Sequence, residues 1–193
     1  MKVYTPKQSV ELFHLLFVDQ LGRKLDKGLY ALKGGCNLRF FFKSIRYSED
    51  IDIDVQEVSE HKLAETVEGI LGSKPFRQIL ETYGISISRL TAPKQTGTTQ
   101  RWRLGLDVTG LSVELPTKIE FSRRGMGSSV VFEAVDPLLI GDYQLGSIMA
   151  NHYDAESTLR QKVGALVGRR AGCMETFGGG KEGSDCVGKG EAE

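Results

Sequence analysis

Cysteine and histidine are scarce in this chain, and their scarcity excludes several kinds of site. Among 193 residues there are three cysteines, without any CxxC spacing: Cys36, Cys173 and Cys186. An odd number of unpaired cysteines argues against a disulfide framework and against a thiolate zinc site. The histidines are scattered and are predicted to be surface or packing residues rather than metal ligands: His14, His61 and His152.

Net charge and long hydrophobic runs are also lacking. Lys plus Arg is 25 and Asp plus Glu is 25, so the net charge is zero and gives no global footprint for nucleic acid, although a local basic patch is allowed. No long apolar run follows the N-terminal residues, so no signal peptide or membrane span is expected, and a cytoplasmic location is the default. A hydrophobic fraction of 40% and a charged fraction of 26% are typical of a globular chain of one domain, with or without an appendage.

Hydrophobic periodicity predicts alternating helices and strands along the chain. The expected helices are residues 5–23, with Thr5 and Gln8 as a capping box, then 37–42, 59–71, 73–84 and, with weak punctuation, 138–167. The expected strands are 29–32, 50–55, 85–90, 102–108, 113–121 and 130–135. A polar turn is expected over 91–99.

At about residue 171 the composition changes. The segment 171–193 is rich in glycine and has no hydrophobic period, which predicts a disordered or frameshifted tail after a domain of residues 1–170. Its Gly-Gly-Gly-Lys resembles part of a phosphate loop. That motif needs a glycine where Glu175 stands and a Ser or Thr where Glu182 stands, so the match fails.

The run "EDIDIDV" places Asp50, Asp52 and Asp54 two residues apart. In a strand, this spacing turns all three carboxylates to one face and the intervening isoleucines to the other. Like charges there repel, and a divalent cation would offset the repulsion. A calcium loop would need glycine and glutamate where Val55 and His61 stand, so this interpretation is rejected. An edge strand with carboxylates facing water remains an alternative.

The neighbouring segments favour a magnesium site. Gly34 and Gly35 lie between a predicted strand and a predicted helix, where the backbone can come close to a phosphate. Glu120 lies on a later strand between apolar neighbours. If that strand lies beside the aspartate strand, Glu120 joins Asp50 and Asp52, and three carboxylates can hold two magnesium ions for attack of a hydroxyl on a phosphate.

The chain resembles the AbiEii/AbiGii toxin family of the DNA polymerase β-like nucleotidyltransferases. The resemblance is carried by "LKGGCNLRFFF", "RYSEDIDIDV", "TKIEFSRR" and "LRQKVGALVGRR", and covers roughly residues 5–170. It implies an α/β (α+β) nucleotidyltransferase fold with a mixed β-sheet flanked by helices. It also implies a Mg²⁺-dependent enzyme that transfers a nucleoside monophosphate from an NTP to an acceptor hydroxyl, with tRNA as a candidate acceptor and a cognate antitoxin protein as a candidate partner.

The resemblance also assigns roles to residues. Gly34 and Gly35 would cradle the triphosphate, with Ser48 close by. Asp50, Asp52 and Glu120 would be catalytic and bind the metal, with Asp54 as a peripheral carboxylate. Lys162 would be catalytic and contact the nucleotide. The residues alone leave other roles open: a solvated helix position for Lys162, and a cross-strand ion pair of Glu120 with Arg103 or Lys118. Arg123 and Arg124 fit either phosphate binding or a surface turn.

One departure from the family pattern affects the expected function. The family continues after the lysine helix into an Arg-Asp-x-x-Asp-Leu-type segment, and nothing similar follows Arg170. A truncated or frameshifted gene is the hypothesis that this suggests, with catalysis impaired. The alternatives are therefore a transferase acting on a small molecule of the aminoglycoside type, or a catalytically inactive family member. An acidic acceptor pocket would favour the aminoglycoside, and a basic groove near Arg101, Arg103, Arg123 and Arg124 would favour RNA.

Overall fold

The computed structural model describes residues 3–127 and 129–175. The chain as a whole divides into two units, Met1–Leu159 and Arg160–Glu193. The helices are α1 Pro6–Lys24, α2 Gly34–Phe41, α3 Glu60–Gly72, α4 Lys74–Thr82, α5 Pro137–Asp142 and α6 Ala155–Glu175. The strands are β1 Tyr30–Lys33, β2 Asp50–Val55, β3 Ile85–Thr96, β4 Thr99–Val108, β5 Leu115–Ser122, β6 Val130–Ala134 and β7 Met149–Tyr153. Helix α6 begins in the first unit and continues into the second. Residues 171–175 of the predicted tail belong to α6, and the rest of that tail lies outside the described residues.

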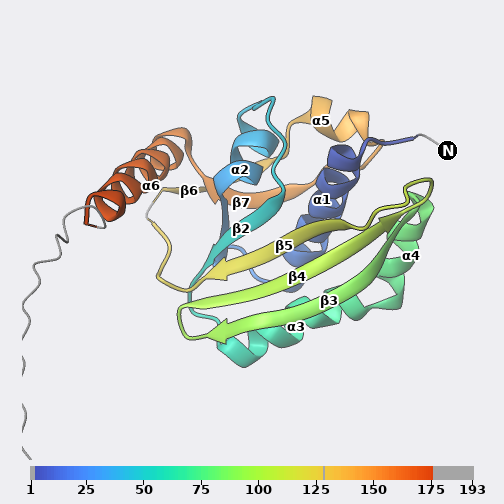
Figure 1. Cartoon of the computed structure of the whole chain (residues 1–193), viewed down its shortest axis with the longest axis horizontal. Coiled ribbons are helices and arrows are strands. Elements are labelled where there is room, and N and C mark those ends of the chain that lie inside the picture. The colour runs from blue at the N-terminus through green and yellow to red at the C-terminus, as the bar shows by residue number, and fades with distance from the viewer. Residues whose placement is uncertain (1–2, 128, 176–193) are drawn as a thin grey trace, which may run out of the picture. The chain divides into compact units, whose positions relative to one another are not determined.

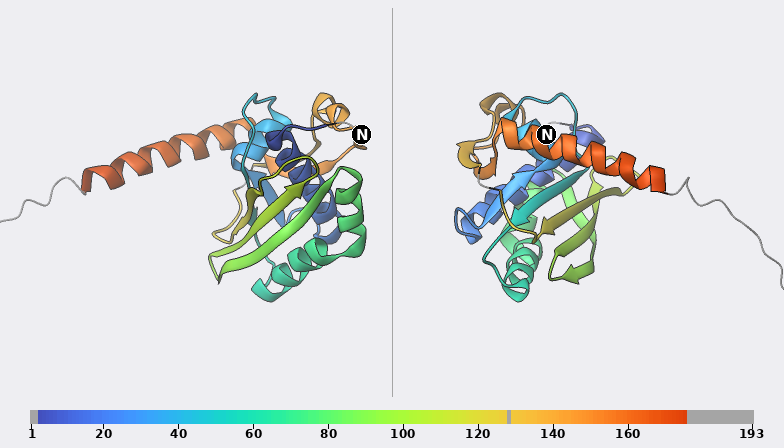
Figure 2. Two further views of the ribbon diagram at one scale, coloured as in Figure 1. Left: turned by 45° about the vertical axis from the view of Figure 1, so that its right-hand side comes forward. Right: turned by 90° about the vertical axis from the view of Figure 1, so that its left-hand side faces the viewer.

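A seven-stranded mixed sheet organises the first unit, in the order β3-β4-β5-β2-β1-β7-β6 (Figure 1). Strand β2 is parallel to β5 and antiparallel to β1, and β1 is parallel to β7. Helices α1, α3 and α4 pack on one face of this sheet (Figure 2). The predicted α/β class with a mixed sheet and flanking helices is confirmed.

Local capping sets several helix starts as the sequence predicts. The Thr5 hydroxyl accepts a hydrogen bond from the backbone N–H of Gln8, and the Gln8 side chain accepts one from the N–H of Thr5, which completes the capping box. Ser59 caps α3 and Ser73 caps α4 in the same way, each accepting from an N–H three residues later.

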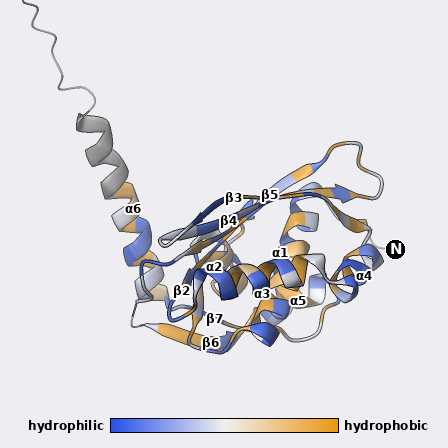
Figure 3. Cartoon of the chain, turned by 90° about the horizontal axis from the view of Figure 1, so that it is seen from below, coloured by the Kyte–Doolittle hydropathy of each residue, from blue (hydrophilic) through white to orange (hydrophobic). Residues whose placement is uncertain are grey.

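The hydrophobic core lies between α1 and the sheet. Figure 3 shows hydrophobic residues along much of α1, whereas β3 is mostly hydrophilic. Helix α1 is buried around most of its circumference, as expected for a helix covered on several sides. The core residues include Leu12, Phe13, Leu15, Phe17, Ile51, Ile53, Trp102, Ile119 and Phe121, all fully buried. This core holds β2, β4 and β5 so that their other face carries polar side chains.

Three predicted elements differ from the structure. The helix predicted over 138–167 is confirmed in α5, up to Asp142, and in α6, from Ala155, but it is wrong between them, where β7 pairs with β1 and β6. Burial between two strands decides this conformation, because Met149–Tyr153 has no strand alternation of its own. The polar turn predicted over 91–99 is shorter in the structure, since β3 continues as an exposed edge strand to Thr96 and only residues 97–98 turn before β4 begins. Helix α2 begins at Gly34, three residues earlier than predicted.

No helix among the described residues is both long and apolar enough to cross a lipid bilayer.

Candidate active site

The aspartate strand β2 alternates its side chains as predicted. Ile51 and Ile53 are fully buried in the core, while Asp50 and Asp52 are partly exposed on the opposite face. Strand β5 lies parallel beside β2, with Glu120 in register with Asp52. The structure therefore brings Glu120 to the two aspartates, although 68 residues separate Glu120 from Asp52 along the chain.

Charged residues form a row across five strands at this register. Lys94 on β3 is paired with Arg101 on β4, Arg101 with Glu120, Glu120 with Asp52, and Asp52 with Lys33 on β1. Because paired residues point to the same face of a sheet, two carboxylates lie between basic residues on both sides. We call Lys94, Arg101, Glu120, Asp52 and Lys33 the charged row.

Gly34 and Gly35 lie at the start of α2, directly beside the charged row. Gly34 has a φ of +70°, and a Cβ there would lie 2.9 Å from Asp52 Oδ2. A Cβ on Gly35 would lie 2.5 Å from Ser48 Oγ. Both glycines are thus needed for the helix start to approach Asp52 and Ser48. No side chain at the N-cap Lys33 bonds to the first turn of α2.

Helix α2 is held in this place by a buried ion pair. Arg39 Nε lies 2.6 Å from Glu11 Oε1 of α1, and the Tyr143 hydroxyl donates to Glu11 Oε2 at 2.6 Å. Arg39 also lies over the ring of Tyr47, 4.7 Å from its centroid. Glu11 is only 2% exposed, so breaking this pair would leave an uncompensated buried charge. The network therefore fixes α2 and the segment 42–49 relative to α1.

Ser48 is anchored to the backbone of the aspartate strand. Its hydroxyl donates to the carbonyl oxygen of Asp50 at 2.7 Å. The same carbonyl oxygen lies 3.4 Å from the thiol sulfur of Cys36, which is buried in α2. These contacts connect the start of β2 with α2.

Lys118 lies between two of the carboxylates. Its Nζ is 3.2 Å from Asp50 Oδ2 and 3.4 Å from Glu120 Oε2. Arg101 Nε donates to Glu120 Oε2 at 2.8 Å. The alternative of a cross-strand ion pair of Glu120 with Arg103 or Lys118 is corrected: the cross-strand partner is Arg101, and Lys118 pairs with Glu120 from the same strand, β5. The register explains the difference, because Arg101 is opposite Glu120 and Arg103 is opposite Lys118.

Burial and charge act in opposite directions on these groups. Burial raises the pKa of Asp52, Glu120 and Asp50 add to that rise, and Lys118 and Lys33 oppose it. Burial would also raise the pKa of Glu120, but its hydrogen bond with Arg101 and the charge of Lys118 outweigh this and lower it. For Lys118, burial favours a lower pKa, and the surrounding carboxylates raise it instead. Glu120 is thus held ionised, while Asp52 retains its proton more readily than an ordinary carboxyl.

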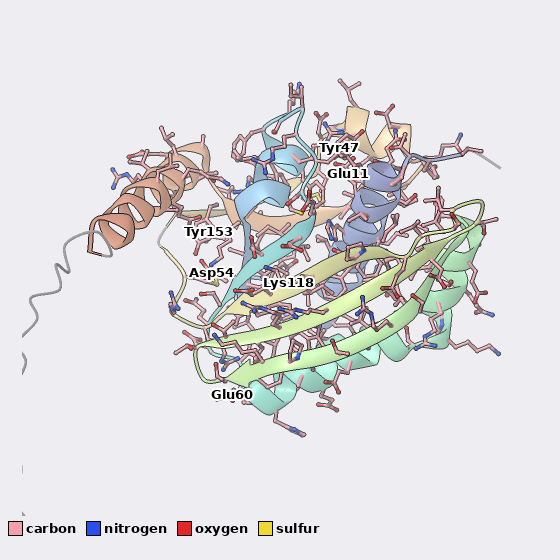
Figure 4. All side chains as sticks on the ribbon, in the orientation of Figure 1. Glu11, Tyr47, Asp54, Glu60, Lys118 and Tyr153 are labelled. Atoms are coloured by element: carbon pink, nitrogen blue, oxygen red, sulfur yellow. The ribbon has the colours of Figure 1, made fainter. Side chains whose placement is uncertain are left out.

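Asp54 is the most buried of the three aspartates, at 6% exposure. Lys33 Nζ lies 2.5 Å from its Oδ1, and the Tyr153 hydroxyl donates to its Oδ2 at 2.8 Å. Figure 4 shows Asp54 near Tyr153, and Lys118 of β5 is in register with Asp50, at the start of β2. Its oxygens are thus engaged by Lys33 and Tyr153. Its expected peripheral role stays a prediction.

The remaining predicted residues lie elsewhere. Lys162 is an exposed residue of α6 in the second unit, which is described by itself, so its role in nucleotide contact stays a prediction. Arg123 has a structural position: it donates to Gln100 Oε1 at 3.1 Å and to the carbonyl oxygen of Val58. Arg124 is exposed. His14 and His152 are buried and His61 is exposed, which confirms that they pack or face water.

The sequence analysis gave no role to Lys33, and it named Lys118 only as an alternative ion-pair partner of Glu120. A signal for each was present in the chain. Lys118 stands two residues before Glu120 and therefore shares its face of β5. Lys33 immediately precedes Gly34 and Gly35, the two glycines that are predicted to lie close to the phosphate.

The site offers oxygen atoms of the kind that bind a hard cation. Carboxylate oxygens are the ligands that Mg²⁺ prefers, and a cationic group, the Lys118 ammonium, already lies between Asp50 and Glu120. Within residues 3–127 and 129–175, however, no three acidic, histidine or cysteine side chains already form a metal cluster. Asp50, Asp52 and Glu120 thus supply the type of oxygen donor that such an ion takes, with the Lys118 ammonium between Asp50 and Glu120.

Comparisons with known proteins bear on the family and the fold of the chain. The sequence model described as nucleotidyl transferase AbiEii toxin, type IV TA system, matches residues 15–173. The crystal structure of JHP933 from Helicobacter pylori superposes with a TM-score of 0.57 at 17% identity, over 83% of this chain and 57% of that one. MenT4, a nucleotidyltransferase toxin from Mycobacterium tuberculosis H37Rv, superposes with a TM-score of 0.63 at 19% identity, over 82% of this chain and 52% of that one. The chain therefore spans little more than half the length of these two proteins. Among curated proteins, none matches.

Proposed function

Because the chain belongs to the AbiEii family of nucleotidyltransferase toxins, we propose that it transfers a nucleoside monophosphate from an NTP to an acceptor hydroxyl in a Mg²⁺-dependent reaction. The observation that carries this proposal is the register of Glu120 with Asp52 on parallel strands, beside the two glycines that begin α2. This arrangement places carboxylates and a helix N-terminus at one point, where a metal-bound triphosphate needs both.

Each group of residues has a distinct part in the proposed reaction. Asp50, Asp52 and Glu120 would hold magnesium, which when bound lowers the pKa of the attacking hydroxyl and neutralises the leaving pyrophosphate. The backbone N–H groups of Gly34 and Gly35 would hold the triphosphate, because α2 begins there without a capping side chain. Ser48 keeps the start of β2 against this turn through its bond to the Asp50 carbonyl oxygen.

For the acceptor, we propose tRNA. Arg103 is exposed on β4 opposite Lys118, and Lys94 is exposed at the outer end of the charged row. These side chains continue the site with positive charge, which suits a phosphate backbone better than a polycationic drug. We further propose that a cognate antitoxin protein is the partner, and that the reaction takes place in the cytoplasm, where NTP and tRNA are available.

The metal–nucleotide site is tested by calorimetric titration of the four NTPs, with and without Mg²⁺. Wild type should bind at least one NTP in a magnesium-dependent manner, and Asp50→Asn/Asp52→Asn should not. Asp26→Asn, which removes an exposed carboxylate between α1 and β1, is the matched control and should bind as wild type does. Asp54→Asn should also bind, because Asp54 is engaged by Lys33 and Tyr153.

Two results would count against the proposal. One is the absence of magnesium-dependent binding in a wild-type sample that circular dichroism shows to be folded. The other is unchanged binding in the double variant. Where binding is found, labelled NTP is incubated with total tRNA and separately with aminoglycosides. Label in tRNA supports the proposed acceptor, and label only in the drug replaces it with the small-molecule alternative.

A further inference from the structure

The position of Lys118 between the carboxylates has a consequence for metal binding. Its ammonium lies 3.2 Å from Asp50 Oδ2 and 3.4 Å from Glu120 Oε2, and its side chain is 27% exposed. It comes from the same strand as Glu120 and is in register with Asp50 on the neighbouring strand. Figure 4 shows Lys118 beside β5 on the sheet face turned to the viewer.

This ammonium has the location that a cation shared by Asp50 and Glu120 would take. One positive charge there relieves the repulsion between carboxylates that the sheet register forces together. A divalent ion and the ammonium cannot both occupy this point, because their charges repel and they use the same oxygen atoms.

We propose that Lys118 is a placeholder for the metal, a positioning residue whose ammonium must leave Asp50 and Glu120 before a divalent cation binds. The inference rests on the proposed metal-dependent function and deepens it. Binding of the bare ion must break two ion pairs and leave the ammonium without a partner. Binding of a metal–nucleotide complex instead offers the ammonium phosphate oxygens as new partners. Lys118 therefore makes occupancy by metal depend on the nucleotide.

The test compares Mn²⁺ affinity, measured by electron paramagnetic resonance of the free ion, in the absence and presence of a non-hydrolysable NTP. Lys118→Met should bind bare Mn²⁺ about tenfold more tightly than wild type, as expected when two partly exposed ion pairs no longer compete. Lys118→Arg keeps the charge and should bind within about twofold of wild type. Lys62→Met, which removes the exposed Lys62–Glu65 pair on α3, is the matched control and should also be unchanged.

The nucleotide supplies the second readout. In wild type, the NTP should tighten Mn²⁺ binding strongly, and in Lys118→Met this enhancement should fall by about tenfold, because the bare site no longer opposes the ion. A merely structural lysine would not alter this ratio. If Lys118→Met does not fold, as judged by circular dichroism, Lys118→Gln is used for the same comparison.

The outcomes separate this inference from the proposed function. An affinity for bare Mn²⁺ in Lys118→Met or Lys118→Gln that is equal to or weaker than that of wild type overturns the placeholder role. This holds even where wild type binds NTP in a magnesium-dependent manner and Asp50→Asn/Asp52→Asn does not, a result that supports the proposed function. Tighter Mn²⁺ binding that persists when Asp50→Asn/Asp52→Asn is added to Lys118→Met places the ion elsewhere and overturns both. Tighter binding that the added substitutions abolish supports the placeholder role.

Discussion

His14 is a buried histidine whose protonation state links the stability of the protein to pH. It is fully buried in α1, with Nε2 2.7 Å from Thr117 Oγ1. The Thr117 hydroxyl donates its only proton to the carbonyl oxygen of Glu49 at 2.8 Å, so His14 Nε2 carries the hydrogen in their contact. The other ring nitrogen, Nδ1, lies 3.7 Å from the Cys36 sulfur. A proton added to Nδ1 would face a thiol rather than a good acceptor.

Burial lowers the pKa of His14 to about 3, from an ordinary value of 6.5. Below pH 6.5 the unfolded chain therefore takes up a proton at this histidine while the folded protein does not. The contribution of neutral His14 to the free energy of unfolding is fully present above pH 6.5 and is lost as the pH falls from 6.5 toward 3. Between pH 8 and pH 5 the two pKa values correspond to a loss of about 2 kcal/mol in the free energy of unfolding.

The assay is urea denaturation of wild type and His14→Gln at several pH values between 8 and 5. Gln keeps a side-chain N–H donor for Thr117 but does not titrate. The free energy of unfolding of wild type should fall by about 2 kcal/mol more than that of His14→Gln over this range, since the carboxylates contribute to both proteins alike. Equal pH dependence in the two proteins would refute the reasoning. If the variant does not fold, the pKa of His14 is measured directly by NMR titration of its ring in wild type. A midpoint above pH 5 contradicts the lowered pKa.

Two further predictions concern the site. Gly35→Ala places a Cβ 2.5 Å from Ser48 Oγ and should destabilise the protein by about 1–3 kcal/mol and weaken magnesium-dependent NTP binding, measured by urea denaturation and calorimetry. Gly69→Ala on α3 meets nothing within 4 Å and is the control; a Gly35→Ala protein as stable as Gly69→Ala would contradict the close packing. Arg103→Met should weaken tRNA binding, reduce its logarithmic salt slope by about 1, and leave NTP affinity unchanged. In a filter-binding assay, tRNA affinity equal to that of Arg23→Met, an exposed control on α1, would exclude Arg103 from the acceptor surface.

Much of the fold was predictable because local patterns determine it. The capping box of α1, the alternation of Asp50 to Val55 and the alternation of β4 depend on residues within a few positions of one another. Strand β7 was not predictable in this way. It is a strand because β1 and β6 supply hydrogen-bond partners on both sides, and its buried His152 stacks on Phe41 with ring centroids 3.6 Å apart. Such pairing is invisible to a local hydrophobic period.

The candidate site divides in the same way. The sequence by itself determined that Asp50 and Asp52 share a face and that the backbone at Gly34 and Gly35 can approach another group closely, since the strand period and the freedom of glycine are local properties. Only the tertiary structure decided that Glu120 meets Asp52, because the register of two strands far apart in the chain depends on how both bury their apolar faces against α1. The same register gave Lys118 its two carboxylate partners.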